Sequence, residues 1–189
     1  DMLALSANNG ALTQEGYDVT FDYRFDTSYG KFRVNWASTY ITEYITEIPL
    51  GSGPLSVVGN YFQFFPVWRL KSNINTNWQY GDWGSTLGIR YISDLTSDCS
   101  TPVAFGNPGL CDNPSGTGRF PFGEHTVDEV WYVDLQGTWD APWNGRVTAG
   151  IRNIFDEDPP VVYDTFANSF DPQYEIPGRF WYVQYSQKF

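Results

Sequence analysis

The stretch that decides the fold runs Val67-Trp-Arg-Leu-Lys-Ser-Asn-Ile-Asn-Thr-Asn-Trp-Gln-Tyr80, because its residues alternate in character along the chain. One parity carries Trp68, Leu70, Ser72, Ile74, Thr76, Trp78 and Tyr80, and the other carries Arg69, Lys71, Asn73, Asn75, Asn77 and Gln79. A β-strand points successive side chains to opposite faces, so its pattern repeats every two residues, whereas a helix repeats every 3.6 or so. The stretch therefore predicts a long strand with one largely apolar face and one hydrogen-bonding face.

The same alternation recurs in six other segments, at residues 17–25, 32–40, 87–91, 131–139, 147–152 and 181–189. Residues 1–7 add a partial strand, which brings the expected number to about eight. No segment has the spacing of an amphipathic helix. We therefore predict an all-β, antiparallel fold.

Short and long connections alternate strictly between these strands. Turn-forming residues fill the short connections at 26–30, 81–84 and 141–145. The long connections span about 46–66, 97–125 and 156–177. This alternation places all long loops at one end, as in outer-membrane barrels, which have short periplasmic turns and longer extracellular loops.

A soluble β-sandwich also alternates, so two further features are needed to favour a membrane barrel. Trp and Tyr gather near strand ends, as at Trp36, Trp68, Trp78, Trp131 and Trp181, and such rings favour membrane interfaces. The opposite faces carry amides and arginines, which suit a hydrated interior. Because open backbone polar groups are costly in lipid, a spanning sheet must close. We expect a transmembrane β-barrel segment with apolar residues outside, extracellular long loops and a periplasmic C-terminus.

Composition excludes several other classes of protein. The 189 residues fit one domain, and the net charge of -11 with only three lysines argues against binding of nucleic acid. Apolar runs such as Val130–Val133 and Phe180–Val183 span four residues, whereas a transmembrane helix needs about 20.

The C-terminal quarter carries a more specific pattern. It reads Gly150-Ile-Arg-Asn-Ile-Phe-Asp-Glu-Asp-Pro-Pro160, followed by Tyr174 and then by Gly178-Arg-Phe-Trp-Tyr182 leading to Phe189. This pattern resembles the end of TonB-dependent outer-membrane receptors, with Ile154 where Leu is commoner. Phe62-x-x-Phe65-Pro66-x-Trp68-Arg69 and Gly88-x-Arg90-Tyr91 look like the preceding hairpins of that family. The resemblance covers about residues 17–189.

The resemblance implies a larger whole. Receptors of this kind are 22-stranded barrels with a plugged lumen. Residues 1–189 are then the C-terminal portion of the barrel, about eight strands, and the plug and the other strands lie outside them. The implied function is active uptake of a scarce nutrient (siderophore-bound iron, cobalamin or an oligosaccharide) across the bacterial outer membrane. The implied partners are TonB, acting through the plug, the missing plug and strands, outer-membrane lipid and lipopolysaccharide, and the barrel-assembly machinery, which reads an assembly signal at Trp181, Val183, Tyr185 and Phe189.

Candidate binding residues are the polar side chains expected near the extracellular mouth, namely Arg69, Arg90, Asp128, Tyr132 and Arg152. Arginines there suit an anionic siderophore because charge-assisted hydrogen bonds are strong. The alternative is that they pair with the plug or with carboxylates of the lumen. The loop aromatics Phe62, Phe64, Phe105, Phe120 and Phe122 suit stacking on a ligand or packing between loops.

Cys99 and Cys111 both lie in the second long loop, and in an oxidising compartment they are expected to form a disulfide. Free thiols or metal ligands are the weaker alternatives. The single histidine, His125, has no catalytic partner in the sequence. The acidic run Asp156–Asp158 meets prolines at once and is better explained as a strand exit than as a calcium site. We expect a non-enzyme without cofactor or metal.

Two other functions stay open at this point. A chain of this length also fits a complete small eight-stranded barrel with a structural, adhesive or passive-pore role. A soluble carbohydrate-binding β-sandwich is the third hypothesis.

Overall fold

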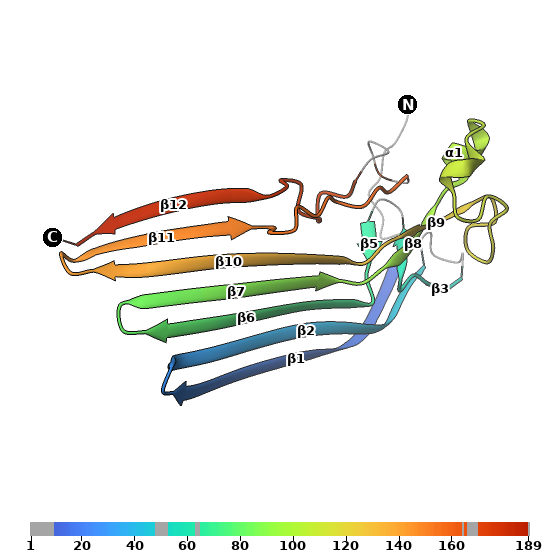
Figure 1. Ribbon diagram of the computed structural model, residues 1–189. Coiled ribbons are helices and arrows are strands. Elements are labelled where there is room, and N and C mark those ends of the chain that lie inside the picture. The colour runs from blue at the N-terminus through green and yellow to red at the C-terminus, as the bar shows by residue number, and fades with distance from the viewer. Residues whose placement is uncertain (1–9, 48–52, 63–64, 164, 166–169, 189) are drawn as a thin grey trace, which may run out of the picture.

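Seven long strands form one antiparallel sheet in which spatial order follows chain order (Figure 1). The computed structural model describes residues 10–47, 53–62, 65–163, 165 and 170–188. The long strands are β1 (Ala11–Thr27), β2 (Gly30–Glu47), β6 (Leu70–Tyr80), β7 (Trp83–Ile92), β10 (Val130–Ala141), β11 (Gly145–Arg152) and β12 (Phe180–Gln187). A short strand, β3 (Leu55–Ser56), also pairs with β2 and makes the sheet eight-stranded. The predicted all-β, antiparallel class is confirmed.

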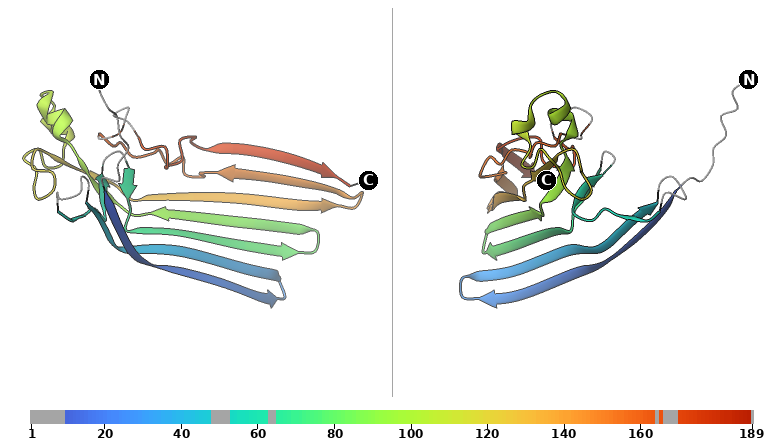
Figure 2. Two further views of the ribbon diagram at one scale, coloured as in Figure 1. Left: turned by 180° about the vertical axis from the view of Figure 1, so that it is seen from behind. Right: turned by 90° about the vertical axis from the view of Figure 1, so that its right-hand side faces the viewer.

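The connections alternate in length as predicted. Residues 28–29, 81–82 and 142–144 form short turns at one end of the sheet, and residues 48–69, 93–129 and 153–179 connect strands at the other end (Figures 1 and 2). We call these the turn end and the loop end.

The long connections hold more regular structure than the sequence predicts. A second sheet has the order β5-β4-β8-β9, formed by β5 (Phe65–Val67), β4 (Asn60–Phe62), β8 (Leu95–Asp98) and β9 (Glu124–Val127). A short helix α1 (Ser100–Ala104) and a 3-10 turn η1 (Pro108–Leu110) follow β8. The expectation that no helix is present was therefore wrong for these two single turns. No helix in the described part of the chain is long and apolar enough to cross a membrane.

Strand register keeps the two faces of the sheet distinct across all seven long strands. Trp36 lies opposite Phe21 on one side and Ile74 on the other, and Leu135 lies opposite Leu87 and Ile151. A shift of one residue at any pairing would move a whole strand's apolar set to the other face. We call the face that carries these residues the apolar face and the opposite one the polar face.

Several strand bounds differ from the expected ones, as in β7, which begins at Trp83 and not at residue 87. β1 and β2 are longer than residues 17–25 and 32–40, because their pairing continues to Ala11 opposite Glu47, past a register shift at Glu15/Gly16. A Cβ on Gly16 would lie 2.6 Å from the carbonyl oxygen of Tyr40, so glycine permits this irregularity. β6 begins only at Leu70, and the partial strand expected at residues 1–7 lies outside the described residues.

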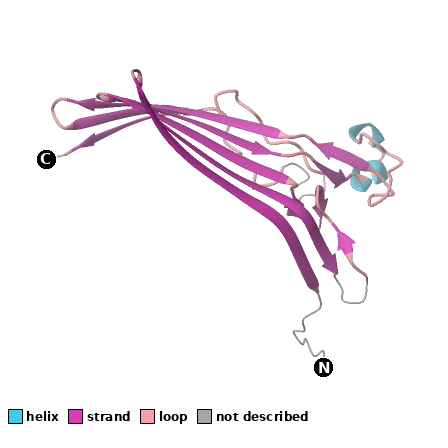
Figure 3. Ribbon diagram, turned by 90° about the horizontal axis from the view of Figure 1, so that it is seen from below, coloured by secondary structure: helices cyan, strands magenta, loops and turns pink. Residues whose placement is uncertain are grey.

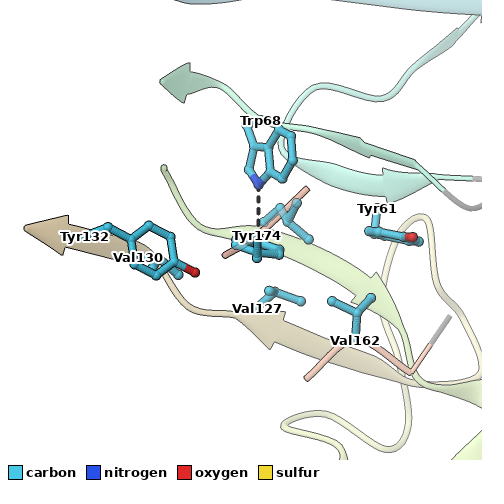
Figure 4. Packing of buried hydrophobic residues seen from close by; sticks show 8 residues of the cluster. Tyr61, Trp68, Val127, Val130, Tyr132, Val162 and Tyr174 are labelled. Carbon is cyan, nitrogen blue, oxygen red and sulfur yellow. Dashed lines mark hydrogen bonds between the residues drawn. The ribbon is translucent and has the colours of Figure 1, made fainter. Parts of the chain in front are cut away.

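The hydrophobic core lies at the loop end and not along the main sheet (Figure 4). Its members are Tyr61, Trp68, Leu95, Val127, Val130, Tyr132, Val162 and Tyr174. The Trp68 ring meets Tyr174 edge-on at 5.6 Å, and Trp68 Nε1 donates a hydrogen bond to Tyr174 Oη over 3.0 Å. Trp68 is only 5% exposed. Its expected place with the interfacial rings of the strands was therefore wrong, because the chain turns it into this core before β6 begins.

The sheet is twisted and open (Figures 2 and 3). β1 and β12 are its two edges, and within the described residues neither pairs with the other. Each edge leaves one row of backbone donors and acceptors without a ladder partner, which a stable sheet has to pair or protect.

Candidate functional site: the two faces and the mouth of the sheet

The apolar face is not covered by any described part of the chain. Trp131 on β10 is 50% exposed, and Trp181 and Val183 on β12 are 66% and 78% exposed. Single exposed apolar residues are common on soluble proteins, but a contiguous apolar face across seven strands is not. Contiguous apolar faces of this kind mark contacts with a partner or with a membrane.

Aromatic rings form two bands on the apolar face. Near the turn end lie Trp78, Tyr80, Trp83, Trp139 and Tyr185, and near the loop end lie Tyr40, Tyr91, Trp131 and Trp181. Rings within each band contact one another. Trp83 and Trp139 stack with centroids 5.9 Å apart, and Tyr91 and Trp131 meet at a tilt of 47° with centroids 4.4 Å apart. Aliphatic side chains such as Ile89, Val133 and Leu135 lie between the bands.

Many groups of the polar face are hydrogen-bonded to one another or paired in salt bridges. A hollow of about 480 Å³ spans it near the turn end, lined in part by Arg24, Asn77, Thr86, Asp140 and Arg146. Arg146 pairs with Asp140 at 2.5 Å, and Thr86 Oγ1 donates to Asn77 Oδ1 over 2.9 Å. These groups suit contact with water or with another polar surface.

Two of the five candidate binding residues meet at the loop end of the polar face. Arg90 Nη2 lies 3.1 Å from Asp134 Oδ2 and also bonds Glu175, and its guanidinium lies 5.1 Å from the centre of the Tyr132 ring. Tyr132 Oη accepts a hydrogen bond from the backbone nitrogen of Glu175. Arg90 thus pairs with two carboxylates on the polar side of the sheet. This arrangement matches the alternative to ligand binding, in which the arginines pair with carboxylates of the protein. Arg90 therefore links β7 and β10 of the main sheet to Glu175 in the last long connection.

The other three candidates do not join this cluster. Asp128 is exposed between β9 and β10, and Arg152 is exposed at the end of β11, neither with an ion pair to another described residue. Arg69 lines a depression with Tyr40, Leu70 and Tyr91, which belong to the apolar face. Its side chain is exposed just before β6 begins.

The loop aromatics differ among themselves. Phe105 and Phe122 are exposed and line one shallow hollow with Pro114 and Pro121, and Phe120 is half-buried. The side chain of Phe62 and the whole of Phe64 lie outside the described residues.

The residues of the C-terminal motif are hydrogen-bonded to one another where the chain passes from β11 to β12, and we call this segment the joint. The sequence does not predict these contacts. Asn153 is buried with a positive φ, and its side chain bonds the backbone nitrogen and oxygen of Glu157 over 2.9 and 2.8 Å. Asp156 Oδ1 accepts a hydrogen bond from the Arg179 backbone nitrogen over 2.6 Å. A Cβ on Gly178 would lie 2.7 Å from that same oxygen, so a larger residue there would have to displace the Asp156 carboxylate.

The predicted disulfide joins Cys99 and Cys111, whose Cα atoms are 5.9 Å apart. Just after it, Asp112 Oδ2 accepts a hydrogen bond from the Thr126 backbone nitrogen over 2.5 Å and lies 3.3 Å from His125 Nδ1. The Thr126 bond, with a smaller contribution from His125, holds the pKa of Asp112 below its usual value. Burial raises the pKa of Tyr174 to about 12. No group of acidic, His and Cys side chains suited to a metal ion occurs in the described part of the chain.

Comparison with models of known protein families finds none that matches this chain, and comparison with curated proteins finds no similar sequence.

Proposed function

We propose that this chain is part of the wall of a TonB-dependent receptor in the bacterial outer membrane. The observation that carries the proposal is the uncovered apolar face between two aromatic bands. Eight residue steps separate Trp131 from Trp139, which is about 27 Å along a strand, or roughly 20 Å after a barrel tilt of about 40°. Outer-membrane barrels have an apolar band about 25 Å tall between aromatic girdles. Lipid is the natural cover for such a face.

The polar face supports the same proposal. In a barrel it lines the lumen, where its amides and paired charges meet water or a plug. The three long connections with their core then form part of the extracellular mouth, and the short turns lie in the periplasm.

Two structural features favour a segment of a larger barrel over the alternatives. β1 and β12 are open edges of 17 and 8 residues, which suits pairing with further strands of the same protein more than mutual closure into a small barrel. A soluble sandwich would need a second layer over the apolar face. The C-terminal motif adds the resemblance to TonB-dependent receptors, with a plug outside residues 1–189.

The proposed activity of the whole protein is active import of a siderophore-bound metal, cobalamin or an oligosaccharide. This chain contributes wall, mouth and part of the selectivity surface. TonB acts on the plug, and the outer-membrane lipids and the barrel-assembly machinery are the other partners. Trp181, Val183 and Tyr185, which belong to the proposed assembly signal, are exposed on the apolar face of β12, and Phe189 lies outside the described residues.

The test is fractionation and transport by the full-length protein in Gram-negative cells with active or inactivated TonB. We expect the protein in the outer membrane and uptake of one labelled compound from a panel of ferric siderophores, cobalamin and oligosaccharides only when TonB is active. Uptake that does not depend on TonB would contradict the proposal and favour a passive pore. Recovery in the soluble fraction would contradict any membrane role.

A further inference from the structure

A small pocket at the loop end lies between the wall and the core. Its lining comes from β2 (Thr39, Ile41, Tyr44), from β5 and the following residue (Phe65, Pro66, Val67, Trp68), and from Lys71 and Gln173. Its volume is about 200 Å³, roughly that of six or seven water molecules at their liquid volume. The walls are mostly rings and aliphatic side chains.

The aromatic wall is held in place by its neighbours. Tyr174 fixes the Trp68 ring by the hydrogen bond and the edge-on contact already described (Figure 4). Tyr44 and Phe65 lie at 6.4 Å with their rings inclined by 53°. A pocket with preformed walls binds a ligand without the cost of ordering them.

Lys71 gives the pocket its charge. Its Nζ atom lies 3.5 Å from the centre of the Trp68 ring, and no carboxylate of a described residue lies within 4.0 Å of it. The carboxylate of Asp171 attracts Lys71 electrostatically without direct contact. The two oxygens of Asp171 already accept hydrogen bonds from Tyr61 Oη and from the Gln173 backbone nitrogen. The hydroxyl of Thr39 is likewise committed to Asp18. Lys71 is thus a half-buried ammonium group with hydrogen-bonding capacity to spare.

We propose that this pocket binds a planar ring that carries a single carboxylate, either as a small molecule or as the end group of a larger one. The ring packs against Tyr44, Phe65 and Trp68, and the carboxylate accepts charge-assisted hydrogen bonds from Lys71. A cationic ligand is repelled by Lys71, and a purely apolar ligand leaves the ammonium group unpaired. The inference rests on the proposed function only in treating this ligand as part of the transported cargo.

The experiment uses the purified protein in detergent micelles and three probes. Benzoate has both ring and charge, benzamide has the ring alone, and acetate has the charge alone. Binding is measured by ligand-observed saturation-transfer NMR with titration. We expect saturable binding of benzoate and at least tenfold weaker binding of benzamide and acetate.

Variants locate the site. Lys71→Gln should weaken benzoate binding at least tenfold, and Lys71→Arg should restore most of it. Lys31→Gln is the matched control, because Lys31 is an exposed lysine at the turn end of the polar face, and it should leave binding unchanged. Each variant should show the same heat-dependent shift in gel mobility as the unaltered protein, which shows that it has folded.

Three results would overturn the inference: no saturable benzoate binding by the unaltered protein, equal affinity for benzamide, or unchanged benzoate binding by folded Lys71→Gln protein. None of them bears on membrane location or on TonB dependence, so failure here is distinct from failure of the proposed function.

Discussion

At the scale of single residues, the two tryptophans Trp68 and Trp131 lie in opposite surroundings. Trp68 is packed in the loop-end core, and Trp131 is half exposed beside Tyr91 on the apolar face. Trp68→Ala should lower the free energy of unfolding in micelles by about 3–5 kcal/mol, since it leaves a cavity in a packed core. Trp131→Ala, which removes a ring from the uncovered face, should cost far less. Urea unfolding of both variants checks this, and equal losses would contradict the placement of Trp68.

Asp112 gives the loop end a pH dependence. Because its pKa is lowered in the folded protein, its contribution to stability is complete above the usual aspartate value near 4 and is lost as the pH falls through the lower folded value. At pH 7, Asp112→Asn should speed hydrogen exchange of the Thr126 amide. The difference from the unaltered protein should vanish at a pH below the folded pKa of Asp112. A rate difference that persisted in strong acid would show that the charge of Asp112 is not responsible.

At the scale of elements, the joint between β11 and β12 couples Asp156 to Gly178. Gly178→Ala should destabilise the protein by about 1–3 kcal/mol, because the new methyl group displaces an oxygen that is hydrogen-bonded to the Arg179 amide. Asp156→Gly removes that oxygen and suits the positive φ at this position. The double variant should therefore be little worse than Asp156→Gly alone. Additive losses in urea unfolding would exclude the contact.

The disulfide should act on its own element and not on the main sheet. Closing a loop with a sequence separation of 12 contributes about 3 kcal/mol in the chain-entropy model. Replacing Cys99 and Cys111 together by Ser should raise hydrogen exchange in residues 99–127 and leave exchange in β6, β7 and β10 unchanged. Loosening of those three strands as well would contradict a local role.

Local alternation made the long strands and their faces predictable. Leu87, Leu135 and Ile151 each fall on the apolar parity of their own strand, and the register places them opposite one another. The loop-end core was not predictable, because strands of two to four residues are too short to show a period. Its contacts also join distant positions, 106 residues apart for Trp68 and Tyr174 and 85 apart for Arg90 and Glu175.

At the scale of the whole molecule, the proposed function depends on what covers the apolar face. An open sheet with an uncovered apolar face is liable to aggregate in water. We propose that lipid covers that face and that further strands pair with the β1 and β12 edges. The core at the loop end then organises the mouth, and the polar face is left for water, plug and cargo.

The most direct test is lipid exposure measured on neighbouring residues of the full-length protein in bilayers. Single nitroxide labels replace Leu87 and Leu135 on the apolar face and Thr86 and Gln136 on the polar face. Labels at 87 and 135 should be accessible to oxygen dissolved in the lipid and shielded from a water-soluble nickel chelate, and labels at 86 and 136 should not show this preference. Apolar-face labels that respond to the nickel chelate as strongly as their polar-face neighbours would contradict the membrane barrel.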